Sequence, residues 1–425
     1  MNPFVRRLQG AAVLKRLGPG LITGAADDDP SGIATYSQAG AQAGLGVLWT
    51  VVLTFPLMVA IQLVSARIGR VTGRGLASNM GRVFPAWVVT GLVALLFIAN
   101  TINIGADLAA MGAAAKLTTG GDEHILTLLL TALSLGLQVM APYHRYVRVL
   151  KWLTLVLFAY VAIIFSVKID WGQVALNTVA PHMVWSGSMI TLVVGVFGTT
   201  ISPYLMFWQA SEEVEDEEAN PNAYPLIERP SQARRELRRI KWDTYVGMAF
   251  SNLIAFFIIL TTAVTLHAAG KTDIQTSAQA AEALRPIAGD FAFLLFTLGV
   301  IGTGLLAVPV LAGSVAYAVG EARGWRVGLE RKPLEAIGFY SVIGIATLLG
   351  LGVDYSPIDP IKALFWSAVI NGVIAVPIMI AMMIIVSKRH EMGQFIASIG
   401  LRIFGWAATG VMAAAAIAMF VFWGQ

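Results

Sequence analysis

Three consecutive carboxylates, Asp27, Asp28 and Asp29, lie in the middle of a mostly apolar stretch of the sequence, residues 17–43. A carboxylate near the centre of a lipid bilayer costs roughly a few kcal/mol or more, so it persists only when it is paired, hydrated or bound to a cation. The acids therefore indicate a cation site inside a membrane span, with Asp29 as the expected ion ligand. A helix-capping acid is the alternative role for Asp29.

A break in the helix is predicted directly after the third acid. Pro30 removes one backbone donor and clashes with the preceding turn, and Gly32 weakens the helix further. Freed carbonyl groups at membrane depth are tolerated only where they are buried in protein or line a polar cavity. Because successive helical residues are about 100° apart, Asp27 and Asp28 cannot share one face with Asp29. We leave two roles open for them, attraction of ions in a vestibule and structural pairing.

The composition is that of an integral membrane protein. Of 425 residues, 57% are hydrophobic and 13% are charged, and the mean hydropathy is +0.72. Too few polar residues remain to cover a soluble globule of this size. The net charge of +4 does not indicate nucleic acid, because the basic residues cluster beside apolar runs. The absence of cysteine excludes thiolate metal sites and thiol nucleophiles. We expect a lipid bilayer as the surroundings and no cofactor.

Eleven apolar runs are long enough to cross about 30 Å of hydrocarbon. They predict an all-α protein that is a single transmembrane domain over residues 1–425. The runs lie near residues 18–43, 46–66, 85–114, 123–142, 147–167, 184–210, 244–267, 291–319, 335–352, 361–387 and 398–423.

The connections between these runs alternate in their content of Lys and Arg, which sets orientation in a membrane. The alternation predicts a multi-pass protein of the plasma membrane with its N-terminus in the cytoplasm and its C-terminus outside. The longest cytoplasmic loop, residues 211–243, begins acidic and ends basic. We expect a solvated connector there with a basic interfacial helix, and the alternative is a metal-sensing acidic cluster.

A second interrupted segment, GVFGTTISPYLMFWQ at residues 195–209, follows five spans after the first. Five intervening spans place the two breaks in halves of opposite orientation, which is the inverted repeat of transporters that bind substrate at mid-membrane. The first repeat is predicted at 17–170 and the second at 184–387. The eleventh span, 397–423, lies outside both.

With both breaks in place, the sequence resembles the Nramp family of divalent metal transporters. The resemblance covers most of the eleven spans and is carried by four stretches: GPGLITGAADDDPSG (18–32), ADLAAMGAA (106–114), GTTISP (198–203) and WDTYVGMAFSNLIAFFI (242–258). It implies a LeuT-type fold with one metal site between spans one and six. It also implies a transporter rather than an enzyme, with a divalent metal ion as substrate. The sequence does not indicate an oligomeric state.

The metal site departs from the family pattern at two ligand positions. The acid of the family's Asp-Pro-Gly-Asn motif is kept as Asp29, but the Asn amide is replaced by Gly32, and the span-six methionine is replaced by Ser202. Thioether sulfur favours softer ions, whereas oxygen ligands and water suit Mg²⁺, which dehydrates reluctantly. By this resemblance we expect Asp29, Ser202, the Thr199 carbonyl and the Thr200 hydroxyl, through water, around a partly hydrated Mg²⁺. Mn²⁺ is a second candidate ion. The pattern is similar to that of the Nramp-related magnesium transporters.

The groups that the family uses for proton coupling are also altered. Span-six histidines of the family correspond here to Tyr204 and Gln209, and in span three Asp107 is kept while the family's Glu is Ala110. Tyrosine titrates near about 10 and an amide does not titrate, so neither relays protons near neutral pH. We therefore expect uptake that is not coupled to protons. The alternative is a proton-coupled Mn²⁺ or Fe²⁺ importer.

Further polar residues are candidates for the ion pathway, among them Tyr204 and Gln209. Four others either face the pathway or bond to a neighbouring helix, and the sequence leaves both roles open: Asp107, Asn371, Thr101 and Asn103. Other functions in the same architecture are a sodium-coupled solute carrier and an ion channel. An intramembrane aspartyl protease would need Asp29 and Asp107 to face each other, but neither lies in a fitting motif.

Overall fold

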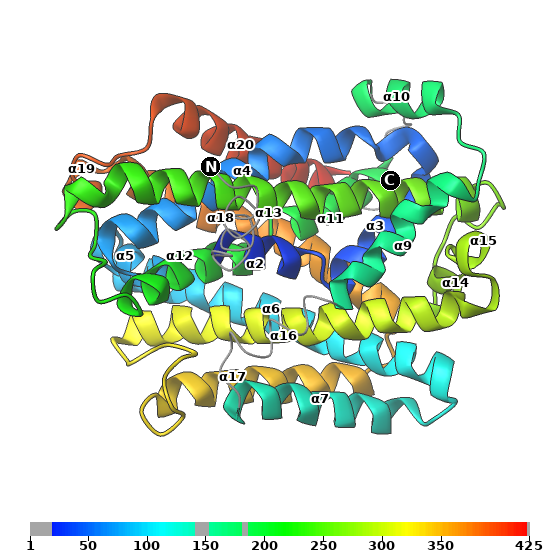
Figure 1. Ribbon diagram of the computed structural model, residues 1–425, viewed down its shortest axis with the longest axis horizontal. Coiled ribbons are helices and arrows are strands. Elements are labelled where there is room, and N and C mark those ends of the chain that lie inside the picture. Colours follow the sequence, from blue (N-terminus) through cyan, green and yellow to red (C-terminus); the bar gives the residue numbers. More distant parts are fainter. Residues whose placement is uncertain (1–18, 141–152, 181–185, 423–425) are drawn as a thin grey trace, which may run out of the picture.

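The computed structural model describes residues 19–140, 153–180 and 186–422, and every regular element within these ranges is a helix (Figure 1). The predicted all-α architecture is confirmed. In this part of the chain nine helical segments are long and apolar enough to cross a membrane. Their principal helices are α4 (Trp49–Thr72), α6 (Ala86–Thr119), α7 (Glu123–Met140), α11 (Gly187–Thr200) followed by α12 (Pro203–Glu218), α13 (Ala233–Thr262), α16 (Ala292–Arg323), α17 (Ile337–Leu351), α18 (Pro360–Ser387) and α20 (Ile399–Val421).

The remaining elements are short. Two of them, α2 (Pro19–Asp27) and α3 (Pro30–Ala43), together form the first predicted span, which is broken as expected. The others are η1 (Gly44–Val47), α5 (Leu76–Val83), η2 (Leu153–Leu157), α9 (Phe158–Val161), η3 (Ala162–Phe165), α10 (Trp171–Val179), η4 (Pro230–Gln232), η5 (Ala263–His267), α14 (Ser277–Glu282), α15 (Arg285–Ala288), η6 (Gly289–Phe291), η7 (Gly352–Tyr355) and α19 (Arg389–Met392).

The predicted fifth span, 147–167, lies partly outside the described residues. Where the chain is described, η2, α9 and η3 follow one another over residues 153–165 instead of one long helix. The repeat boundaries at 17–170 and 184–387, and the orientation of the termini, stay predictions.

The two halves of the first span lie in the middle of the bundle (Figure 1). Helix α2 packs on α13 and α12, while α3 packs on α13, α18 and α11. The crossing of α2 with α13 depends on two glycines, because a Cβ atom at Gly24 would come within 2.3 Å of the carbonyl oxygen of Gly247. This backbone-to-backbone contact positions the acids that end α2.

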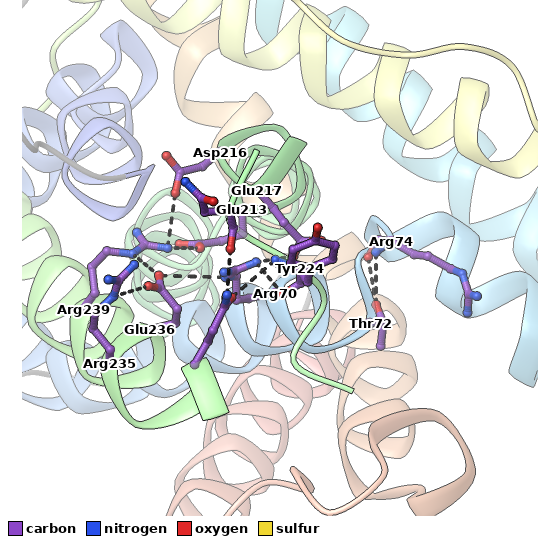
Figure 2. Close-up of polar contacts among 12 residues, drawn as sticks. Arg70, Thr72, Arg74, Glu213, Asp216, Glu217, Tyr224, Arg235, Glu236 and Arg239 are labelled. Carbon is purple, nitrogen blue, oxygen red and sulfur yellow. Dashed lines mark hydrogen bonds and ion pairs between the residues drawn. The ribbon is translucent and has the colours of Figure 1, made fainter. Parts of the chain in front are cut away.

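The expectation of a solvated acidic connector is wrong for much of residues 211–218. Helix α12 continues to Glu218, and Glu212, Glu213 and Glu217 on it are buried. Glu217 pairs with Arg70 of α4, and Arg239 of α13 donates to Glu213 at 2.5 Å (Figure 2). Arg70 of α4 and Arg239 of the basic half therefore neutralise acids of α12, which allows these acids to be buried.

These contacts belong to a larger set that we call the ionic cluster. Glu236 accepts from Arg239 at 3.0 Å and from Arg235 at 2.9 Å, and it lies 3.9 Å from Arg70 (Figure 2). The cluster joins the ends of α4, α12 and α13 and consists of Arg70, Glu213, Asp216, Glu217, Arg235, Glu236 and Arg239.

We expect the substitution Gly24→Ala to lower the thermal unfolding temperature of the purified protein. The new methyl group would meet the Gly247 carbonyl and force α2 away from α13, and overpacking of this kind costs about 1–3 kcal/mol. Gly344→Ala in α17 is the matched control, because a Cβ atom there meets nothing within 4 Å. Equal unfolding temperatures for the two variants would contradict the proposed close packing of α2.

Candidate functional site

Two helix breaks of the same construction face each other at the centre of the bundle. Asp29 is the N-cap residue of α3, which begins with Pro30, and Ser202 is the N-cap residue of α12, which begins with Pro203. Proline suits the first position of a helix because its missing N–H would have no partner there, and its φ angle is already helical. Both breaks predicted from the sequence are confirmed.

The carboxylate of Asp29 is held by two donors from different parts of the chain. Its Oδ1 atom accepts from the backbone N–H of Gly32 at 2.6 Å, and its Oδ2 atom accepts from the side-chain amide of Asn103 at 3.2 Å. The residue is 2% exposed. Asp29 is therefore a helix cap, and each carboxylate oxygen keeps a lone pair that is free to approach a cation. The cap and ligand roles are compatible.

Gly32 lies where the two breaks come close together. A Cβ atom at this position would lie 3.3 Å from three oxygens: the carbonyl of Asp27, Oδ1 of Asp29 and Oγ1 of Thr199. A side chain at this position would press against oxygens of both breaks, so glycine allows the two breaks to approach closely. The structure brings Asp29, Gly32 and Thr199 together, although the Thr199 atom near Gly32 is its hydroxyl oxygen and not the predicted carbonyl.

The two other predicted ligands of the second break are turned partly toward their own helix. The hydroxyl of Ser202 donates to the carbonyls of Gly198 at 2.9 Å and Thr199 at 2.8 Å. The Thr200 hydroxyl bonds to the carbonyl of Val196 at 2.7 Å and to the hydroxyl of Tyr36 at 2.9 Å. The Ser202 hydroxyl is therefore bonded to the carbonyl of Thr199. Neither of the two hydrogen-bond partners of the Thr200 hydroxyl is Asp29.

Asn103 of α6 connects the predicted pathway residues to Asp29. Its amide nitrogen also donates to Asp107 at 3.2 Å, and its oxygen accepts from the amide of Asn371 on α18 at 3.1 Å. All three are at most 1% exposed. Sequence reasoning left open whether Asn103 faces the pathway or bonds to a neighbouring helix. It lies four residues before Asp107, a spacing that places both on one helix face.

Asp27 and Asp28 point to α13 rather than to the break. The hydroxyl of Ser251 lies 2.5 Å from Oδ2 of Asp27 and 3.1 Å from Oδ1 of Asp28. Both acids are buried, with at most 1% exposure. The single hydroxyl proton of Ser251 cannot be donated to both carboxylates at once. The described residues therefore provide only part of the hydrogen bonds that the two acids can accept. Ser251 was not foreseen.

Tyr204 and Gln209, predicted as possible pathway residues, hold α12 against α2. The Tyr204 hydroxyl donates to the carbonyl of Ala26 at 3.1 Å, and Gln209 accepts from the hydroxyl of Thr23 at 2.6 Å. At the beginning of α2, the N–H of Gly20 donates to Asp243 of α13 at 2.8 Å. These contacts fasten α2 along its length and close that side of the site.

The groups at the break that could bind a metal ion are oxygen and amide groups, and Asp29 is the anion among them. Within the described ranges no group of three or more His, Asp or Glu side chains is placed to hold a metal ion together. The two breaks, Asp107 and Asn371 are at most 3% exposed, so the site is closed to both sides. An arrangement of one anionic oxygen with carbonyl, hydroxyl and amide groups suits a hard cation.

The sequence matches a family profile described as "Nramp: Natural resistance-associated macrophage protein-like" over residues 20–422. A relative named divalent metal cation transporter MntH from Klebsiella pneumoniae (strain 342) is 27% identical over 413 residues, 94% of this chain and 92% of the relative. A protein of the same name from Pectobacterium carotovorum subsp. carotovorum (strain PC1) is 29% identical over 314 residues, 71% of each chain.

Two solved structures support the fold. A manganese transporter from Eremococcus coleocola is similar with a TM-score of 0.73 at 15% identity, over 95% of this chain and 85% of that one. Mhp1, a nucleobase-cation-symport-1 family transporter in a closed conformation, is similar with a TM-score of 0.56 at 12% identity, over 95% and 91%. These likenesses confirm the predicted LeuT-type fold.

We expect Asn103→Ala to destabilise the purified protein by about 1–3 kcal/mol. The change leaves Asp29, Asp107 and Asn371 without the amide that joins them, and buried groups that lose a partner carry a desolvation penalty of that size. Thermal unfolding measures the effect. Asn177→Ala is the control, since the Asn177 amide bonds only locally, to the Gln173 carbonyl, on an exposed helix. If both variants unfold like the unmodified protein, Asn103 does not hold the site together.

Proposed function

The chain belongs to the Nramp family, and from this premise we propose that it carries divalent metal ions across the membrane by alternating access, with Mg²⁺ as the principal substrate. The observation that carries the proposal is the surroundings of Gly32, where Asp29 is the one side-chain anion among oxygens that a Cβ atom would meet at 3.3 Å. It is a transporter in this proposal rather than an enzyme, and the metal ion is cargo rather than cofactor.

The choice of Mg²⁺ follows from the ligand chemistry. Ser202 and Thr199 supply oxygen at the second break, where a thioether would favour softer ions. Mg²⁺ usually keeps several of its waters and is bound by one or two carboxylates. Asp29 supplies the carboxylate, and the Thr199 hydroxyl of the second break lies near Gly32. We propose Mn²⁺ as a second permeating ion.

We propose that transport is not coupled to protons. Tyr204 and Gln209 make hydrogen bonds to α2, which fits structural roles for these two residues. Neither side chain exchanges protons near neutral pH. Uptake would then be driven by the membrane potential, which contributes about 2.3 kcal/mol per elementary charge per 100 mV.

The closed site supports alternating access. Since the residues of both breaks are at most 3% exposed, an ion cannot enter or leave without a rearrangement. We propose that α2, fastened by Gly20, Thr23 and Ala26, moves away from α12 and α13 to open the site to the cytoplasm. We propose that the protein lies in the plasma membrane with its N-terminus in the cytoplasm and its C-terminus outside, as the distribution of Lys and Arg among the connections indicates.

A second candidate is a proton-coupled Mn²⁺ or Fe²⁺ importer. It is favoured by the relatives, which are named divalent metal cation transporter MntH and, for the structure from Eremococcus coleocola, manganese transporter. The two candidates differ in ion preference and in proton movement, and the following experiments separate them.

We expect Asp29→Ala to reduce the flux of Mg²⁺ and Mn²⁺ into proteoliposomes by at least about tenfold, because the site loses its anion. Asp290→Ala removes an exposed acid outside the site and should leave both fluxes unchanged.

For the unmodified protein, excess Mg²⁺ should suppress Mn²⁺ uptake. Full Mn²⁺ uptake in excess Mg²⁺ would favour the second candidate, and unchanged flux in Asp29→Ala would overturn the metal site itself.

Proton coupling is tested with a pH-sensitive dye enclosed in the same proteoliposomes. We expect Mg²⁺ uptake to rise with an inside-negative potential, imposed with potassium and valinomycin, and to proceed without acidification of the interior. Liposomes lacking the protein give the background leak. Acidification in fixed proportion to the metal taken up would exclude uncoupled transport.

A further inference from the structure

A groove on the surface of the bundle lies apart from the metal site. It has a volume of about 340 Å³ and is bounded by α4, α13 and the beginning of α20. The three helices occupy one side of the molecule (Figure 1). This volume is within the range of roughly 300–1,000 Å³ found for ligand pockets. The walls are mainly apolar, with Phe55, Val59 and Leu63 from α4, Leu237 and Ile240 from α13, and Phe404 from α20.

Two cationic side chains also line this apolar groove. Lys241 is exposed, and its ammonium group lies 5.9 Å from the centre of the Tyr245 ring. Arg67 donates to the carbonyls of Phe395 at 3.0 Å and Ile396 at 3.2 Å, which fixes the segment leading to α20. Neither cation forms an ion pair with an acid of the described ranges. The groove therefore combines an apolar floor with uncompensated positive charge.

The charge continues along the outer face of α13. Arg234, Arg238 and Lys241 are exposed and follow one another at spacings of four and three residues, so they lie on one helix face. Arg235 and Arg239 are instead engaged with acids of the ionic cluster (Figure 2). The ionic cluster thus engages Arg235 and Arg239 and leaves beside the groove three exposed cations of α13 that form no ion pair with the described residues: Arg234, Arg238 and Lys241.

The groove also has the features of a membrane–water boundary. Trp242 and Tyr245, 67% and 39% exposed, flank it on α13, and aromatic side chains of this kind gather at the headgroup level. Helix α20 begins here with Ser398 as its N-cap, and the amide end of a 23-residue helix favours negative charge. The apolar part of the groove extends from this end along α4 toward Phe55.

We propose that the groove binds an anionic phospholipid. One acyl chain lies on the apolar wall of α4, and the phosphate group is held by Lys241, with Arg234 and Arg238 adding to the local positive potential. The argument is charge complementarity: basic residues beside gaps between membrane helices bind anionic headgroups. A zwitterionic lipid would gain the apolar contacts but not the charge, and a second copy of this chain would bring the same three cations against its own.

The headgroup part of the proposal is tested with the full chain reconstituted in vesicles of phosphatidylcholine and phosphatidylglycerol in equal amounts. Lipid retained after extraction is measured by native mass spectrometry. The protein should retain phosphatidylglycerol in preference to phosphatidylcholine, and Lys241→Gln should reduce that preference about fivefold, the effect expected for one basic residue. Lys332→Gln, an exposed lysine outside the groove, is the matched control and should change nothing.

The acyl-chain part is tested by filling the groove. Gly400 lines it, and a Cβ atom there meets nothing within 4 Å, so Gly400→Leu occupies the space without a clash. Gly410→Leu adds the same side chain to the same helix outside the groove, where a Cβ atom is equally unhindered. We expect the first variant to lose the retained phosphatidylglycerol and the second to keep it, with equal unfolding temperatures.

Three results would overturn the proposal. Equal retention of the two lipids by the unmodified protein would show that the groove does not recognise an anionic headgroup. Retention in Gly400→Leu equal to that in Gly410→Leu would place the bound lipid elsewhere. A change from dimer to monomer in Gly400→Leu, measured by light scattering, would identify the groove as an interface between copies of the chain.

Discussion

The structure depends on one constraint, that a carboxylate buried in a membrane protein must find donors where water is absent. Asp29 meets it with the N–H of Gly32 and the amide of Asn103, at 2.6 and 3.2 Å. The first donor exists only because the helix is interrupted, since a continuous helix would use that N–H internally. The break is therefore both the source of the site's free carbonyl groups and the support of its anion.

The surrounding helices are arranged so that this interrupted backbone is buried against protein rather than lipid. Helix α2 approaches α13 at the level of backbone atoms through Gly24 and Gly247, and Tyr204 of α12 takes up the carbonyl of Ala26 near the end of α2. Such pairing satisfies groups that would each cost several kcal/mol in hydrocarbon. The same contacts therefore close the site and provide hydrogen-bond partners for its backbone groups.

The sequence was sufficient to predict the two breaks, because Asp29-Pro30 and Ser202-Pro203 act locally. It left the role of Asn103 open, since one asparagine on an apolar helix is equally suited to any interhelical bond. The acidic end of α12 was misjudged for a different reason. Its partner Arg70 lies 147 residues away from Glu217, so neutralisation could not be seen in the local pattern.

The burial of the ionic cluster has a consequence for how the protein responds to its medium. Arg70 and Glu217 are only 3% and 8% exposed, and Glu213 is fully buried, so dissolved ions have little access to them. Pairs of this kind are screened much less than surface pairs. The ends of α4, α12 and α13 should therefore remain joined at salt concentrations that disrupt ordinary surface ion pairs. This side of the bundle would then stay intact when the salt concentration in the cell rises under osmotic stress.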